Sequence, residues 1–152
     1  RVPAPARRLK VIERLAAAGI PVRLMASPII PGLTDHEIER LVQAGAEAGA
    51  RAASMITLRL PLEVGPLFRD WLETHMPDRA GRVMARVREM QGGKAYSSEY
   101  GTRMTGTGVY ADLLQKRFAR ARRAHGLAKE LPPLRCDLFA VPLVRGDQLS
   151  LF

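Results

Sequence analysis

The chain has 152 residues, the size of one average domain, and its hydrophobic share of 47% is typical of a folded globular protein. No apolar run approaches the ~18–20 residues that cross a bilayer, so we expect no transmembrane helix and no membrane partner. Cys136 is the only cysteine, which excludes an internal disulfide and a multi-cysteine metal site and favours a cytoplasmic location. Because Arg1 rather than a methionine comes first, we expect the chain to be part of a longer protein.

The net charge of +9 is concentrated in the segment 79–129. This segment holds 12 of the 24 basic residues and only three of the 15 acidic residues, so the rest of the chain is neutral overall. Lys and Arg side chains that neutralise phosphates release counterions, so this asymmetry indicates a polyanionic partner. A solvated helix face is the alternative interpretation.

The first half of the chain alternates helix and strand. Apolar residues at helical spacing predict a helix over 7–18, and a short strand follows over 22–26. A second helix is expected over 35–48 and a second strand over 52–60. This order predicts a parallel β-α-β unit preceded by a helix, and because two strands make no stable sheet, we expect further strands upstream.

The second half is helical and basic. Short helices are predicted over 66–75 and 78–90, and a long polar loop over 94–108 leads into a basic amphipathic helix over 109–125. An extended, proline-containing tail is expected from residue 131 onward. In the basic helix, the residues expected to face inward are Leu113, Leu114, Phe118 and Ala121.

The segment 28–35, PIIPGLTD, joins the first strand to the following helix. Ligands of α/β sheets bind at this end of the strands, over the helix N-terminus. Ile30, held between Pro and Gly residues, suits the face of an adenine whose edge its backbone could hydrogen-bond. A plain turn is the alternative, because Thr34 and Glu37 form the pattern of a capping box.

Several stretches carry a resemblance to a known family. The order helix, GIP, strand, SPIIPGLTD, helix, AGA, strand and LRLP resembles the second half of a radical S-adenosylmethionine barrel. It is most similar to bacterial members related to spore photoproduct lyase, since the later stretches MQGGK and YGTRMTGTG resemble the C-terminal part of that subgroup. The resemblance covers about residues 2–127. It implies an α/β fold, the C-terminal part of a partial (β/α)6 barrel followed by a helical, basic extension.

The resemblance also implies a cofactor contact in the turn 28–35. Radical S-adenosylmethionine enzymes carry the pattern G-x-I-x-G-x-x-E after the fifth strand, and its Ile contacts the adenine of the cofactor. Ile30 and Gly32 match the pattern, whereas Pro28 and Asp35 depart from it. The cofactor-binding residues that carry over are therefore Ile30 and Gly32.

The same family holds a 4Fe–4S cluster in a Cys-x3-Cys-x2-Cys loop after the first strand. The cluster reduces S-adenosylmethionine to a radical that removes a hydrogen atom from the substrate. The chain lacks that loop, and Cys136 alone cannot replace three thiolates. We therefore expect S-adenosylmethionine and the cluster only in the intact protein, and the chain alone to be inactive.

The loop over 94–108 and the basic helix after it carry the residues expected to contact nucleic acid. The loop offers donors for phosphate oxygens, and Tyr96 and Tyr100 could stack on bases. The related lyases repair DNA, so the resemblance implies a nucleic-acid-related substrate. The expected contact residues are Arg103, Lys116, Arg117, Arg120 and Arg123. The alternative is a loop that only covers the mouth of the barrel.

The last five residues have the sequence QLSLF. They resemble the pentapeptide with which bacterial proteins bind the DNA polymerase sliding clamp. In this interpretation two apolar side chains enter a pocket and the glutamine makes polar contacts at its rim. The partner-binding residues are Gln148, Leu149, Ser150, Leu151 and Phe152. The alternative is a terminal segment that packs on its own domain.

Three segments follow from these patterns: a barrel-like β-α-β segment over 1–65, a basic helical extension over 66–130 and a tail over 131–152 that ends in QLSLF. The leading hypothesis is the C-terminal part of a bacterial iron–sulfur radical enzyme that acts on a nucleic-acid-related substrate. The competing hypothesis is a non-catalytic module that binds nucleic acid and the sliding clamp. A helix-rich structural domain without a ligand is the third alternative.

Overall fold

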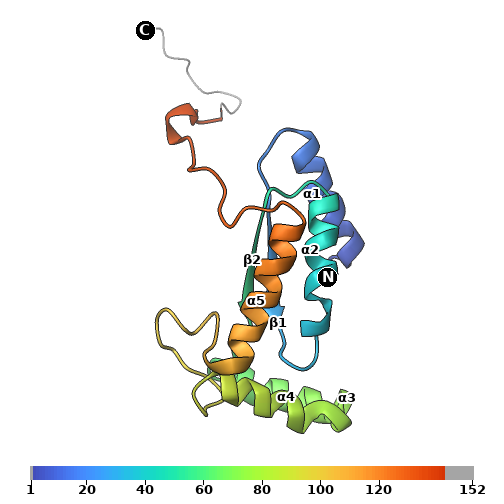
Figure 1. The fold of residues 1–152 in the computed structure, drawn as a ribbon, viewed down its shortest axis with the longest axis vertical. Helices are drawn as coiled ribbons and strands as arrows, with labels where there is room; N and C mark the ends of the chain where they lie inside the picture. The colour runs from blue at the N-terminus through green and yellow to red at the C-terminus, as the bar shows by residue number, and fades with distance from the viewer. Residues whose placement is uncertain (1, 143–152) are drawn as a thin grey trace.

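The computed structural model describes residues 2–142 and is of mixed α/β class (Figure 1). Its helices and strands follow one another in the order expected from the sequence. They are α1 (Pro5–Ala17), β1 (Arg23–Ile29), the 3₁₀ turn η1 (Asp35–Glu37), α2 (Ile38–Glu47), β2 (Ala52–Thr57), α3 (Val64–His75), α4 (Pro77–Met90), α5 (Gly108–Ala124) and the 3₁₀ turn η2 (Cys136–Leu138).

The sheet consists of β1 and β2, which pair in parallel and are connected by α2. The register runs from Arg23 opposite Ala52 to Ala26 opposite Met55, and it is irregular between Ala26 and Ile29. The parallel β-α-β prediction is therefore confirmed. Within the described residues β1 pairs with β2 alone, so the wider barrel remains a prediction.

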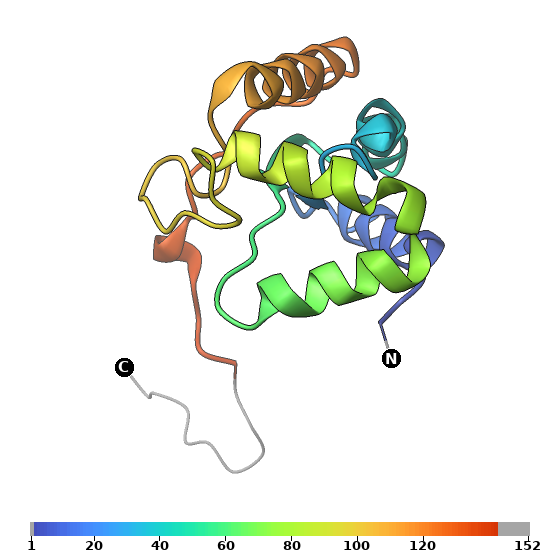
Figure 2. The ribbon, with the colours of Figure 1, turned by 90° about the horizontal axis from the view of Figure 1, so that it is seen from below.

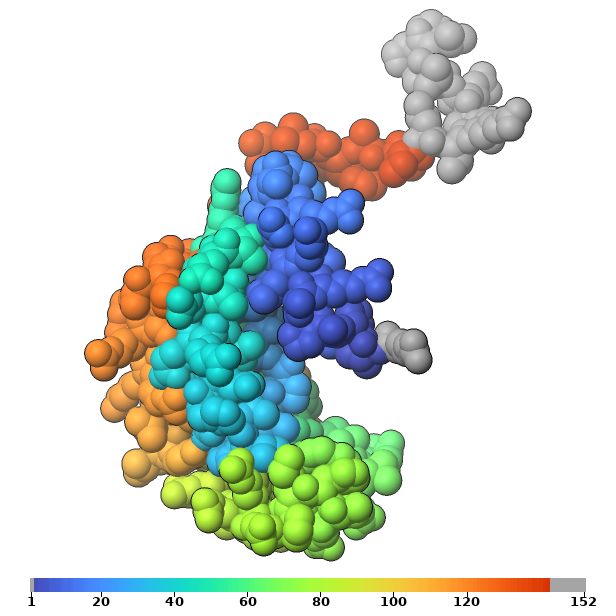
Figure 3. All heavy atoms as spheres, turned by 90° about the vertical axis from the view of Figure 1, so that its right-hand side faces the viewer, coloured from blue at the N-terminus to red at the C-terminus, as the bar shows by residue number. Residues whose placement is uncertain are grey.

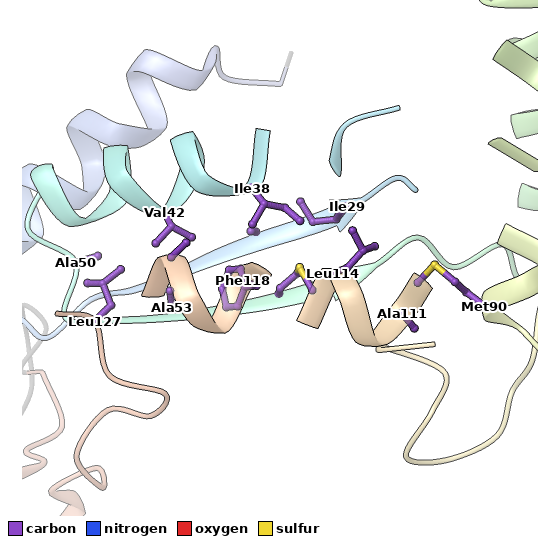
Figure 4. Packing of buried hydrophobic residues seen from close by; sticks show 13 residues of the cluster. Ile29, Ile38, Val42, Ala50, Ala53, Met90, Ala111, Leu114, Phe118 and Leu127 are labelled. Carbon is purple, nitrogen blue, oxygen red and sulfur yellow. The ribbon is translucent and has the colours of Figure 1, made fainter. Parts of the chain in front are cut away.

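Helices α2 and α5 cover one face of the sheet, as Figure 4 shows, and the main core lies between them. Ile38 and Val42 of α2 meet Leu114 of α5 there, and all three side chains have no solvent exposure. The α5 residues that are buried are Ala111, Leu114, Phe118 and Ala121. The expected inward position of Leu113 is therefore wrong, because its side chain is 47% exposed and Ala111 takes the inner position.

Helices α3 and α4 lie across the end of the sheet at which both strands finish (Figures 1 and 2). They form a second apolar cluster that includes Leu72 of α3 and Val83 and Val87 of α4. Ile30 and Leu58, which come directly after the two strands, pack against this cluster. The second cluster therefore packs against the end of the sheet where ligands of α/β folds bind.

The opposite face of the sheet is open. Met25 of β1 is 51% exposed and Ser27 is also exposed, whereas their neighbours Ser54 and Ile56 of β2 are only partly buried. In the space-filling view the surface is hollowed between α1 and the α3–α4 pair (Figure 3). Parallel sheets in complete folds are covered on both faces, so this face is unusual for a parallel pair.

Three local predictions need correction. Strand β1 continues past Ala26 to Ile29 through a cis Ser27–Pro28 bond, and β2 ends at Thr57 instead of reaching residue 60. The segment Asp35–Glu37 is a 3₁₀ turn, and Thr34 makes no side-chain cap to it. The Thr34 hydroxyl instead accepts a hydrogen bond from the Ile30 N–H in the turn before the helix.

No helix within residues 2–142 has the length and the apolar composition that crossing a membrane requires.

Candidate functional site

The turn between β1 and α2 is held by hydrogen bonds within itself. The Ile30 N–H donates to Thr34 Oγ1 at 2.9 Å, and the Ile30 carbonyl accepts from the N–H groups of Leu33 at 3.1 Å and Thr34 at 2.9 Å. Gly32 has a φ of +74°, a left-handed conformation that favours glycine. This part of the predicted cofactor wall is therefore rigid without any ligand.

Asp35 connects this turn to α5. The residue is 7% exposed, and its Oδ2 accepts hydrogen bonds from the Gly32 N–H at 2.9 Å and from the Tyr110 hydroxyl. The Arg86 guanidinium lies 4.5 Å from the centre of the Tyr110 ring. Burial and the hydrogen bond to Asp35 raise the pKa of Tyr110, so its phenol stays neutral and keeps donating. The Asp35 carboxylate thus joins the turn to α5, and Arg86 of α4 lies against the ring of its partner Tyr110.

The geometry of Ile30 decides what the turn can offer an adenine ring. Its N–H and both acceptor positions of its carbonyl are already used, so the backbone hydrogen bond to a base edge expected from the sequence has no free partner here. The partly buried Ile30 side chain offers an apolar contact instead. A Cβ placed on Gly32 would lie 3.9 Å from Val83 Cγ2, so α4 stands directly beside the turn.

The predicted nucleic-acid contacts divide into two groups. Lys116, Arg120 and Arg123 are exposed and follow one another at helical spacing along one stripe of α5. Arg103 lies in the loop, where its guanidinium is 5.5 Å from the centre of the Tyr100 ring. Among the described residues none of these three side chains forms an ion pair, so the stripe offers three cations on one helix.

Arg117 is engaged within the protein. Its Nε and Nη2 donate to the two carboxylate oxygens of Glu39 on α2 at 2.9 and 2.7 Å. The Arg117 guanidinium holds the pKa of Glu39 below its usual range. Arg117 therefore joins α5 to α2, and it contributes less free positive charge than its neighbours Lys116 and Arg120.

The sequence did not single out Arg59, which ties the loop after α4 to the end of β2. Its Nη2 donates to the Tyr96 hydroxyl at 3.1 Å, and its guanidinium lies 5.8 Å from the centre of that ring. The Arg59 Nε is buried and has no hydrogen-bond partner among the described residues. Only its place just after a strand could have indicated a role at this end of the sheet.

No group of three His, Cys, Asp or Glu side chains within residues 2–142 could hold a metal ion. Cys136 is exposed and lies in the η2 turn of the tail. The predicted clamp-binding residues Gln148–Phe152 lie outside the described residues.

The chain is similar to uncharacterized proteins of Mycobacterium tuberculosis and Mycobacterium bovis. Each is 31% identical over 90 residues, which amount to 58% of this chain and 25% of the relative. The matched segment therefore spans about a quarter of the length of the curated relatives. No protein-family model and no solved structure matches the chain.

Proposed function

We propose that the chain is the C-terminal part of an iron–sulfur radical S-adenosylmethionine enzyme that acts on a nucleic-acid-related substrate. In this proposal β1, α2 and β2 are the last strands and helix of a partial (β/α)6 barrel. The turn after β1 is the adenine-side wall of the cofactor site, and α5 carries the surface that meets the substrate.

One observation carries the proposal. The residues that match the family pattern, Ile30 and Gly32, lie in the turn at the C-terminal end of a parallel strand, and this strand has an open face and an open edge. A parallel pair of strands is incomplete by itself, because such sheets are covered on both faces and contain more strands. Further barrel strands beside β1 would bury Met25 and complete the sheet.

The residues present fit one part of the cofactor site. The rigid turn and the Ile30 side chain suit the apolar face of an adenine ring, whereas its polar edge needs donors and acceptors other than those of Ile30. The single cysteine does not fit a 4Fe–4S cluster, which would supply the electron for radical formation. In the proposal the ligands of the cluster therefore lie outside this chain.

The chain's own residues would then perform positioning. Asp35 fixes the turn through the Gly32 N–H, and Tyr110 ties Asp35 to α5. Because α5 also carries the free cations Lys116 and Arg120, the helix that meets a polyanion is joined directly to the cofactor wall. Phosphate contacts of such cations orient a nucleic acid without reading its sequence.

The test uses the gene product at its full encoded length, purified without oxygen and reconstituted with iron and sulfide. The measured quantities are bound iron and the formation of 5′-deoxyadenosine from S-adenosylmethionine. We expect Ile30→Ala to raise the KM for S-adenosylmethionine roughly tenfold through the lost apolar contact. The matched control is Ile20→Ala, a half-exposed isoleucine before β1, which should leave that KM unchanged.

A protein that binds no iron and cleaves no S-adenosylmethionine would contradict the proposal and favour a non-catalytic basic module. Equal KM values for the two isoleucine variants would contradict the assignment of the turn as the cofactor wall. A second pair of variants, Gly32→Ala and Gly19→Ala, introduces the same left-handed backbone strain inside and outside the turn. A change in KM at Gly32 alone is therefore an effect on the site and not of backbone strain.

We also propose, on the sequence alone, that Gln148–Phe152 binds the sliding clamp. Deletion of these five residues should abolish a micromolar interaction with the clamp, measured by surface plasmon resonance. Equal binding by the shortened and the complete chain would contradict this proposal.

A further inference from the structure

A groove of about 600 Å³ runs along the outer edge of β2, between this strand and α5. Ala53, Ser54 and Met55 of β2 form one wall, and Phe118 and Ala119 of α5 belong to the other. The groove lies along the edge of β2 that is not paired with β1, although Arg23 at the start of β1 also lines it, and it includes no residue of the turn that carries Ile30.

The backbone of β2 directs unpaired groups into this groove. The Leu58 N–H donates to the Ile29 carbonyl, so the backbone N–H and C=O groups of the even-numbered residues point toward β1. The backbone groups of the odd-numbered residues point away from β1. The Ala53 N–H donates to the Ala128 carbonyl at 3.1 Å, and the Thr57 N–H donates to the Met104 carbonyl at 2.9 Å. Between these two contacts the alternation directs the N–H and the carbonyl of Met55 outward, and neither has a hydrogen-bond partner within residues 2–142.

The charged side chains around this gap are mostly cationic. Four basic residues line the groove against one acidic residue, Glu130. The amide nitrogen of Gln115, which also lines it, is buried and has no hydrogen-bond partner among the described residues. The four cations are Arg23, Lys116, Arg122 and Lys129.

We infer that this groove binds an extended acidic peptide, which adds to the open edge of β2. An added strand would pair with Met55 over about three residues, or about 10 Å, between the contacts of Ala128 and Met104. Its carboxylates would meet the four cations, and its apolar side chains would lie on Met55 and Phe118. A phosphate backbone would use the cations alone and leave the Met55 N–H and carbonyl unpaired, so the edge favours a peptide.

The experiment measures fluorescence anisotropy of a labelled octapeptide of alternating Glu and Val, added to the protein at low salt. The variants are Arg122→Ala in the last turn of α5 and Lys129→Ala in the segment after it. The matched controls are Arg88→Ala in the last turn of α4 and Lys94→Ala in the loop after α4, neither of which lines the groove. We expect each groove variant to weaken binding about threefold to tenfold and each control to leave it unchanged.

Two further probes separate the contributions. The same peptide with alternate backbone N-methyl groups keeps its charges but cannot pair with a strand edge, so it should bind more weakly. An oligothymidylate of eight nucleotides should bind more weakly than the peptide and should not distinguish Arg122→Ala from Arg88→Ala.

Lack of peptide binding, or an equal effect of Arg122→Ala and Arg88→Ala, would overturn the inference. Equal affinity of the methylated peptide would overturn strand addition. Tighter binding of the oligothymidylate with dependence on Arg122 and Lys129 would make the groove a nucleic-acid site instead. If Arg122→Ala lowers the melting temperature, the Lys129→Ala result decides, because residue 129 lies outside the helices.

Discussion

The hydrogen bond from Tyr110 to Asp35 is the contact that joins α5 to the turn after β1, and Tyr110→Phe removes it with little loss of volume. Asp35 then keeps one donor, the Gly32 N–H, at a site where the residue is 7% exposed. A hydrogen bond to a charged group contributes roughly 1.5–3 kcal/mol to stability, and a buried acceptor without its donor carries a desolvation cost. We therefore expect Tyr110→Phe to lower the free energy of unfolding by about 2 kcal/mol.

The matched control is Tyr100→Phe, which removes the same atom from a side chain that is 88% exposed and should change stability by less than about 0.5 kcal/mol. Urea unfolding followed by circular dichroism gives both values from the transition midpoints, provided that the slope with denaturant stays constant. A double-mutant cycle with Asp35→Ala isolates the interaction energy of Asp35 and Tyr110, since Tyr110→Phe should lower stability little when Asp35 is already replaced. Equal effects of the two tyrosine variants would refute the assignment of Asp35 and Tyr110 as a stabilising link.

Three further predictions follow from the packing and the charges. Glu39→Gln should remove the ion pair with Arg117, which stabilises the fold above the ordinary glutamate pKa and stops doing so as the pH falls through the lowered pKa of Glu39. Because both side chains are partly exposed, the variant should lose less than about 1 kcal/mol of unfolding free energy near pH 7. In unfolding curves measured in acid, the difference between the variant and the unchanged protein should vanish. Gly81→Ala should raise stability by about 0.5–1 kcal/mol, because an added Cβ meets nothing within 4 Å in this helix; a lower melting temperature would contradict it. Gly45→Ala gains the same helix propensity but should lower the melting temperature, because its Cβ would lie 2.7 Å from Leu24 Cδ2; a gain equal to that at Gly81 would show that Leu24 moves freely.

The order of helices and strands could be predicted because glycine residues follow the ends of several helices, whereas the prolines did not mark the ends of the two strands. Gly19 and Gly49 both have positive φ values and follow the helices that the sequence predicted. The inner stripe of α5 was predicted only in part. The more hydrophobic Leu113 was expected inside but is exposed, whereas the smaller Ala111 is buried. Helical geometry rather than side-chain size decides which of them faces the core.

The contacts within the candidate site could not be predicted from local patterns. Asp35 and Tyr110 are 75 residues apart, and the sequence offered Thr34 and Glu37 as a capping box instead. The structure uses the Thr34 hydroxyl as the acceptor for the Ile30 N–H, a local side-chain to backbone bond that competes with helix capping. The engagement of Arg117 by Glu39 likewise depends on how α5 packs on α2, which helix periodicity does not specify.

The proposal that this chain completes a radical S-adenosylmethionine barrel is tested most directly by the coding sequence upstream of Arg1. We predict an in-frame Cys-x3-Cys-x2-Cys motif within roughly one barrel half of ~150–200 residues. The residues between this motif and Arg1 should supply the parallel strands that cover Met25 and the open edge of β1. A stop codon, or a start codon close to Arg1, would contradict the proposal and leave the basic binding module as the function to pursue.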